Sequence, residues 1–141
     1  MLKDKIFRYL AGFISIYHIL LGLAGIFGSR DFIEPIISRV YGVTPVFDAQ
    51  FLYLAKFISA YFIVFGLMMG FVALNPRRYA QLAWVAIALF AIRITQRLVF
   101  FGLLKDAFHI TFAQNLQILI PITLLLIGLI VFHPGSNTDQ K

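Results

Sequence analysis

Cysteine is absent from this chain, and acidic residues are scarce. None of the 141 residues is Cys, which excludes disulfides, thiol catalysis and thiolate metal sites and leaves the redox compartment undetermined. Asp and Glu number 6 together, and charged residues make up 13% of the chain, against roughly 25% in an average soluble domain. No Ser/His/Asp arrangement, Gly-rich phosphate loop or cluster of metal-binding carboxylates and histidines is visible. The sequence therefore leaves enzymatic activity undecided and favours a non-catalytic role.

Hydrophobic residues are abundant instead, at 61% of the chain, and 16 of them are Phe. A soluble protein of this size has too little interior to bury so much apolar surface, so lipid is the expected solvent. Four long apolar segments cover residues 6–27, 51–74, 79–104 and 111–132. Each is close to the roughly 20 residues that cross a bilayer as an α-helix. We predict an all-α integral membrane four-helix bundle, with the first segment retained as a span.

The third segment is interrupted by Arg93, Gln96 and Arg97. If it were a helix on the membrane surface, only three spans would remain. A surface helix is polar along one whole face, however, whereas residues 82–92 are apolar all round. We therefore keep four spans.

The connections contain signals of their own. Between residues 29 and 41 apolar side chains recur at helical spacing among charged ones, which predicts a short amphipathic surface helix between the first two spans. Thr44-Pro45 and Asn75-Pro76 are typical helix starts, and Asp48 is expected in the first turn of the second span. We predict one transmembrane domain at residues 1–134 and a polar C-terminal tail at 135–141.

Lys and Arg residues near the ends of the spans predict the orientation, because cytoplasmic loops carry more of them. One side has Lys3, Lys5, Arg8, Arg77, Arg78 and Lys141, and the other has Arg30, Arg39 and Lys105. This bias predicts that both termini are cytoplasmic, with a bacterial inner membrane as the expected location. The net charge of +6 is therefore explained by topology and buried cations, and no nucleic-acid partner is expected.

Polar side chains inside the predicted spans are costly, so each needs a reason. The candidates for binding a ligand or partner are Lys56, Arg93, Arg97, His18, Gln114 and Gln117. We predict that they form a cationic, amide-lined pocket that opens towards the outer face. Other roles remain open. Lys56 and Arg97 are long enough to reach the interface, Arg93 is able to pair with helix-end carbonyls or a loop carboxylate, and His18, Gln114 and Gln117 suit interhelical hydrogen bonds.

Acidic side chains that could compensate these cations are found only outside the predicted spans. No Asp or Glu lies within the four apolar segments, so Asp48 and Asp106 are the carboxylates best placed to compensate the cations. No metal or cofactor is expected. The three histidines fall at different predicted depths, which disfavours a haem held by two of them.

Two loose motifs give the chain a family resemblance. A basic residue early in the second span precedes a glycine-containing apolar run (Lys56, then Gly66), and Gln96-Arg97-Leu98 late in the third span precedes Gly102. On these features, the chain resembles the DoxX-like small four-helix membrane proteins, especially the uncharacterised branch with the BphX-like proteins. The resemblance covers most of the four spans and implies a four-helix bundle without a settled activity. The group often has an acid in its fourth helix, where this chain has Gln114, Asn115 and Gln117.

Two functional hypotheses follow. The first is a non-catalytic accessory or binding subunit of a larger membrane assembly. The alternative is a carrier or binder of an anionic or carbonyl-bearing small molecule, such as a lipid head group or a quinone. The expected partners are membrane lipids and other membrane-protein subunits. Gly66-x-x-x-Gly70 permits close helix packing, which leaves a homo-oligomer open.

Overall fold

The computed structural model describes residues 2–43 and 45–135, and it contains six helices and no strand in that part of the chain. The helices are α1 (Leu2–Phe27), α2 (Arg30–Tyr41), α3 (Ala49–Leu74), α4 (Ala80–Val99), α5 (Phe101–Phe108) and α6 (Phe112–Val131). The helix-start signal at Thr44 and residues 136–141 of the predicted tail fall outside the described residues.

The four predicted spans are confirmed as helices. α1, α3, α4 and α6 are each long and apolar enough to cross a membrane. α6 begins at a complete capping box: the Thr111 hydroxyl accepts the Gln114 N–H, and the Gln114 side chain accepts the Thr111 N–H in return. This exchange satisfies two backbone donors that the first turn leaves unpaired. The all-α membrane bundle predicted from the sequence is thus the observed fold class.

The third apolar segment is shorter than predicted. α4 ends at Val99, and residues 101–108 form the separate short helix α5 instead of continuing to residue 104. The bend places Leu104 and Phe108 against the interior and leaves Lys105 and Asp106 exposed. If α4 continued straight, the polar residues of α5 would extend along the span. The turn instead lets the apolar side of α5 face the interior while its polar side stays exposed.

Two helix starts also differ from the predictions. Asp48 precedes α3 as its N-cap, accepting the Phe51 N–H at 2.7 Å, and does not belong to the first turn. Asn75 closes α3 and accepts the Arg78 N–H through its side chain at 3.2 Å, while α4 begins only at Ala80. Residues 76–79 form a turn, so the Asn75 side chain caps this turn and not α4.

α1 and α3 are antiparallel neighbours with the closest packing in the molecule. The approach depends on residues without side chains at the crossing. A Cβ on Gly66 would lie 2.9 Å from both the Ser15 carbonyl oxygen and the Ile19 nitrogen, and one on Gly22 would lie 2.7 Å from the Ser59 carbonyl oxygen. The glycine pair noted in the sequence therefore faces α1 of the same chain: Gly66 meets its backbone, and Gly70 lies opposite the Ser15 hydroxyl.

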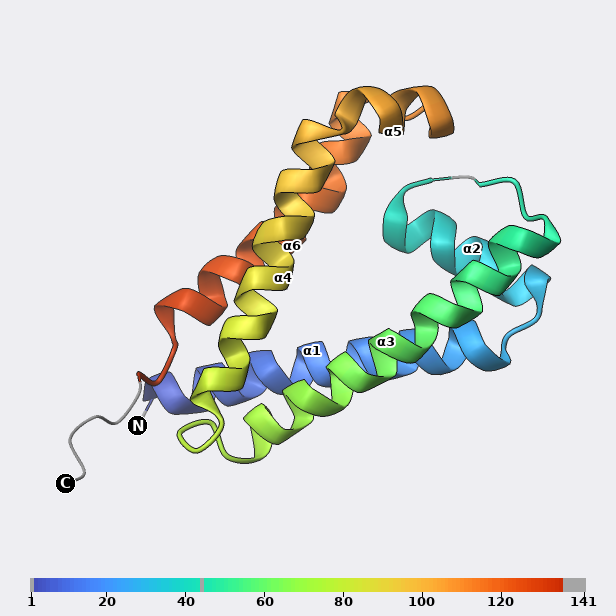
Figure 1. Ribbon diagram of the computed structural model, residues 1–141. Helices are drawn as coiled ribbons and strands as arrows, with labels where there is room; N and C mark the ends of the chain where they lie inside the picture. Colours follow the sequence, from blue (N-terminus) through green and yellow to red (C-terminus); the bar gives the residue numbers. More distant parts are fainter. Residues whose placement is uncertain (1, 44, 136–141) are drawn as a thin grey trace.

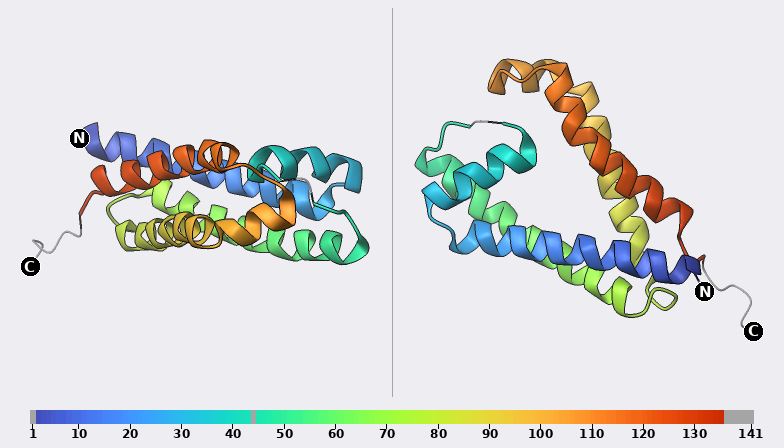
Figure 2. Two further views of the ribbon diagram at one scale, coloured as in Figure 1. Left: turned by 90° about the horizontal axis from the view of Figure 1, so that it is seen from above. Right: turned by 180° about the vertical axis from the view of Figure 1, so that it is seen from behind.

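The four spans form an open V (Figures 1 and 2). α1 and α3 make the first arm, and α4 and α6 make the second. The arms meet near the described chain ends and the α3–α4 link, where the buried core includes Phe7, Met69, Phe90 and Leu129. They diverge towards the end that carries α2 and α5. The bundle is therefore closed at one end and hollow at the other.

The predicted amphipathic helix between the first two spans is present as α2, and it faces the hollow end. Ile33 is buried, and together with Ile36 and Ile37 it lines the space between the arms. Asp31, Glu34 and Arg39 are exposed. Helical spacing alone separates these two sets of residues onto opposite sides, which places the apolar side of α2 on the interior.

Candidate ligand-binding cavity

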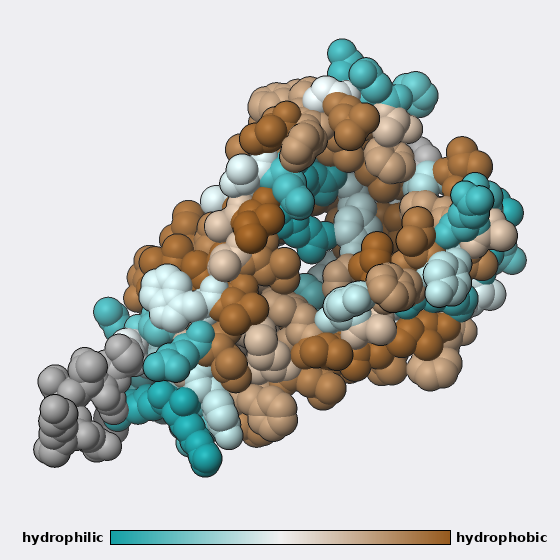
Figure 3. All heavy atoms as spheres, in the orientation of Figure 1, coloured by the Kyte–Doolittle hydropathy of each residue, from teal (hydrophilic) through white to brown (hydrophobic). Residues whose placement is uncertain are grey.

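A cavity of about 590 Å³ lies between the two arms at the open end of the V. α1, α2, α3, α4 and α5 all contribute to its wall, which is mostly aliphatic and aromatic. Figure 3 shows the hollow on the face of the molecule, with hydrophilic atoms on the wall beside α4 and hydrophobic atoms around them. This volume is within the range of roughly 300–1,000 Å³ found for small-molecule sites. The apolar wall with a local polar group suits an amphiphilic occupant.

Arg97 lies on the cavity wall and joins three helices. Its Nε donates to Oδ1 of Asn115 on α6 at 2.9 Å, and one terminal nitrogen donates to the Tyr41 carbonyl oxygen at 2.8 Å. The Asn115 amide in turn donates to the Arg97 carbonyl at 3.3 Å. Tyr41 is the last residue of α2, where the helix dipole favours a cation. Two N–H groups of Arg97 therefore have structural partners.

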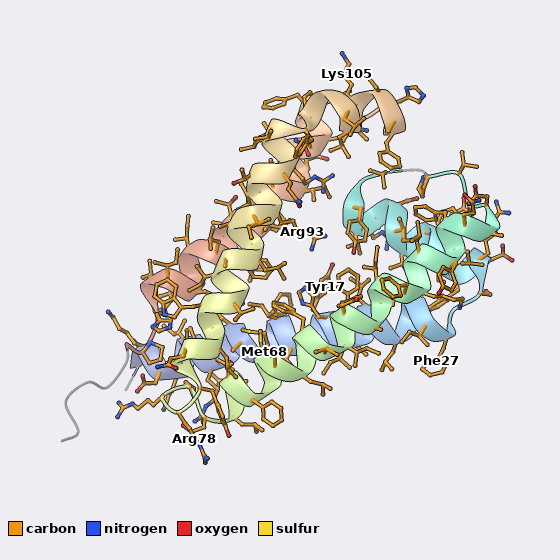
Figure 4. The ribbon with its side chains drawn as sticks, in the orientation of Figure 1. Tyr17, Phe27, Met68, Arg78, Arg93 and Lys105 are labelled. Atoms are coloured by element: carbon orange, nitrogen blue, oxygen red, sulfur yellow. The ribbon has the colours of Figure 1, made fainter. Side chains whose placement is uncertain are left out.

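Arg93 lies one turn before Arg97 on the same side of α4, since positions four apart align. Its guanidinium carbon is 5.1 Å from the centroid of the Tyr41 ring, a cation–π contact. Figure 4 shows Arg93 of α4 and Tyr17 of α1 projecting into the same space between the arms. Arg93 makes no salt bridge with a described carboxylate, and its polar contact on the same side is with the Tyr41 phenol. A guanidinium carries five N–H donors, so Arg93 keeps donors available to a ligand.

The tyrosines at this site were not predicted from the sequence. Burial raises the pKa of the Tyr41 phenol above its ordinary value, and the Arg93 charge acts in the opposite direction. Tyr41 is therefore a neutral phenol at physiological pH. In the sequence, Tyr41 looks like an ordinary interfacial tyrosine at the end of an amphipathic helix. Its contact with Arg93 is visible only in the structure, where the end of α2 lies next to α4. For Tyr17, the sequence feature that could have indicated a role in the site is its position next to His18 inside a span.

His18 also lines the cavity, and it is only 4% exposed. Its Nδ1 lies 2.8 Å from the Ile14 carbonyl oxygen one turn earlier. The structure therefore brings together three of the predicted site residues, namely His18, Arg93 and Arg97, in the lining of one cavity.

Lys56 is placed elsewhere. Its ammonium donates to the carbonyl oxygens of Ile26 at 2.7 Å and Gly28 at 3.3 Å, at the C-terminal end of α1. Those carbonyls have no partner within their own helix, and the helix dipole makes them attractive to a cation. Lys56 therefore ties α3 to the end of α1 and lies outside the described residues that line the cavity.

The two glutamines are also separate from the cavity wall as far as the described residues define it. Gln114 is exposed and belongs to the capping box of α6. Gln117 is exposed on α6. Asn115, between them in sequence, is fully buried and is the amide that contacts Arg97. Of the three amides, only Asn115 contacts an arginine of the site.

The carboxylates suggested as compensating groups do not reach the arginines. Asp48 caps α3 and Asp106 is exposed on α5. Within residues 2–43 and 45–135, the salt bridges join Arg77 to Asp4 at 2.9 Å and Arg30 to Glu34 at 3.8 Å. The same residues contain no group of three His, Asp or Glu side chains suited to a metal ion. Arg93 and Arg97 therefore leave a net positive charge on the cavity wall.

Comparison with known proteins finds no family model, no curated protein and no solved structure that matches this chain. Function therefore has to be inferred from the geometry and chemistry of the cavity.

Proposed function

We propose that this chain is a non-catalytic membrane protein that binds an amphiphile in the cavity between its arms. The occupant has a head with an acidic or carbonyl oxygen and an apolar body, as a membrane lipid or a quinone has. The observation that carries the proposal is Arg93: a half-buried cation on a largely apolar cavity, with no carboxylate partner among the described residues. A cation in such a place is stabilised by an anionic or electron-rich group.

Two features support binding from the membrane. The hollow opens sideways between the arms at one end of the V (Figure 3), so a lipid-like molecule in the bilayer has lateral access to it. Apolar side chains of α2 and α5 line the cavity together with the arginine pair. An apolar body would bury surface against them, which is favourable by about 25 cal/mol per Å² where it replaces contact with water.

The two arginines are assigned different parts in this proposal. Arg97 holds α2, α4 and α6 together through Tyr41 and Asn115. Arg93 contacts the ligand head, because a guanidinium fork is able to donate two parallel hydrogen bonds to a carboxylate or phosphate. This division predicts that Arg93 substitutions affect binding before they affect folding.

The test measures binding of two probes, hexadecanoic acid and a single-chain lysophosphatidic acid, to the purified protein in nanodiscs. Arg93→Gln should weaken the preferred probe by about tenfold to a hundredfold, since a hydrogen bond to a charged group contributes roughly 1.5–3 kcal/mol. Arg93→Lys should lose less. The matched control is Arg78→Gln, because Arg78 also contacts a tyrosine ring, at 5.4 Å, but at the closed end.

A second variant tests the cavity without changing its charge. Ile36→Trp fills part of the wall and should exclude both probes while thermal unfolding in detergent stays close to that of the wild type. If neither probe binds the wild type, or if Arg93→Gln and Ile36→Trp both bind as the wild type does, the proposed function is wrong. The two probes also distinguish a carboxylate from a phosphate head.

An accessory-subunit role is the second candidate, and the open V favours it. The second arm contacts the first mainly near the closed end, so a helix of another subunit would have room beside the cavity. Native mass spectrometry of the same preparation would give a stoichiometric protein partner in this case and a retained small molecule in the first. We also propose that the chain is a member of the DoxX-like group and that both of its termini are cytoplasmic, with a bacterial inner membrane as its location.

A further inference from the structure

His18 is the most deeply buried titratable side chain on the cavity wall, at 4% exposure. Aromatic rings surround its imidazole: the centroid of Phe65 is 4.7 Å away and that of Phe62 is 6.0 Å away, both edge-on, and Phe90 lies at 6.4 Å. Packing of this kind fixes the plane of the imidazole. The two ring nitrogens therefore have defined and different surroundings.

The first nitrogen is already used within α1. Nδ1 lies 2.8 Å from the Ile14 carbonyl oxygen, and a carbonyl oxygen only accepts hydrogen bonds. Nδ1 must then carry the proton. Apolar rings disfavour a charged imidazolium, as does the positive charge of Arg93, which lines the same cavity. A neutral imidazole with its proton on Nδ1 presents Nε2 as a hydrogen-bond acceptor.

The second nitrogen has different surroundings. No hydrogen bond to Nε2 occurs among the described residues, yet none of their buried polar side-chain atoms is left without a partner. Nε2 is therefore accessible, and the cavity that His18 lines is the space available to it. The cavity lining thus includes donors on Arg93 and an acceptor on His18.

We infer that the ligand of this cavity is a hydroxylated acidic amphiphile, whose hydroxyl group donates a hydrogen bond to Nε2 of His18 while its acidic oxygen faces Arg93. This inference rests on the proposed function and narrows the ligand class. A ligand with an acid and a plain hydrocarbon chain would cover Nε2 without satisfying it. A site with a buried polar group discriminates against such analogues because that group is left unpaired.

The experiment measures the affinity of the wild-type protein for hexadecanoic acid and for a set of monohydroxyhexadecanoic acids, which are positional isomers of one another. At least one isomer should bind about three- to tenfold more tightly than the parent acid, the gain expected from one hydrogen bond. His18→Phe should remove this preference, because a phenyl ring offers no acceptor to the hydroxyl group. The matched control is His133→Phe, because His133 also bonds a backbone carbonyl, that of Ala80, but at the closed end.

A measurement on the wild type makes the test independent of how well the variants fold. With ¹⁵N-labelled histidine, the preferred isomer should shift the Nε2 resonance of His18, and the parent acid should shift it less. If the parent acid binds but no isomer is preferred, or if the preference persists in His18→Phe, the inference is wrong and the proposed function stands. If neither the parent acid nor any isomer binds, both fail.

Discussion

Replacing Arg97 should cost about half as much free energy of unfolding in a protein that already lacks Asn115 as in the wild type. Arg97 donates to the Asn115 side chain at 2.9 Å, and the Asn115 amide donates back to the Arg97 carbonyl at 3.3 Å. Asn115 is fully buried. Arg97→Leu therefore leaves a buried amide oxygen without its donor, and Asn115→Leu leaves a guanidinium nitrogen without its acceptor.

The magnitude follows from the cost of unpaired polar groups. A buried group left unsatisfied costs about 1–3 kcal/mol, while interhelical hydrogen bonds in membrane proteins average about 0.6 kcal/mol, with a maximum near 1.7 kcal/mol. We expect each single substitution to lower the free energy of unfolding by about 2 kcal/mol. The double variant should lose about 1 kcal/mol less than the sum of the single losses. The intrinsic difference between Arg and Leu in lipid appears in both legs of the cycle and cancels.

The assay is the free energy of unfolding measured by SDS titration of the protein in mixed micelles, for the wild type, both single variants and the double variant. Gln117→Leu replaces Asn115→Leu in a control cycle, because Gln117 is an exposed amide on the same helix. Its effect should add to that of Arg97→Leu. A coupling for Arg97 and Asn115 below about 0.3 kcal/mol, the scatter expected for independent sites, would refute the pairing.

Two further predictions concern helix packing and topology. Gly66→Ala should lower the free energy of unfolding by about 1–3 kcal/mol because its Cβ meets the α1 backbone, whereas Gly102→Ala, with open space around it, should be neutral or slightly stabilising; equal melting temperatures in detergent for the two variants would contradict the close α1–α3 approach. In this cysteine-free chain, Asp106→Cys should react with an impermeant thiol reagent in intact cells and Asn137→Cys should not, and the reverse pattern would invert the orientation.

Much of the fold could be predicted because lipid simplifies the problem. Four apolar runs of sufficient length leave few alternatives to four helices, since every backbone polar group in a bilayer must be paired within its own segment. The spacing of Ile33, Ile36 and Ile37 likewise predicted an amphipathic helix. Local rules were less reliable where the chain turns. Asn75 caps a turn and not α4, and the third apolar segment bends at Phe100 into α5.

The candidate site was only partly accessible from the sequence. Periodicity placed Arg93 and Arg97 on one side of α4, and both line the cavity. Periodicity did not show that Lys56 has a different role from these arginines. In the structure Lys56 bonds carbonyls at the end of α1 and is not among the described residues that line the cavity. Tyr41 did not stand out, because its contact with Arg93 depends on α2 folding back towards α4.

The sequence by itself determined the kinds of polar group that the membrane must accommodate, and the tertiary structure decided their partners. The cost of a cation in lipid depends on its type and depth, both of which the sequence gives. Every residue, in contrast, carries a backbone carbonyl able to accept a hydrogen bond, so composition does not identify the Tyr41 carbonyl as the partner of Arg97. That choice depends on the divergence of the two arms and on the position of α2 between them, because helix packing sets which carbonyls and side chains lie within hydrogen-bonding distance.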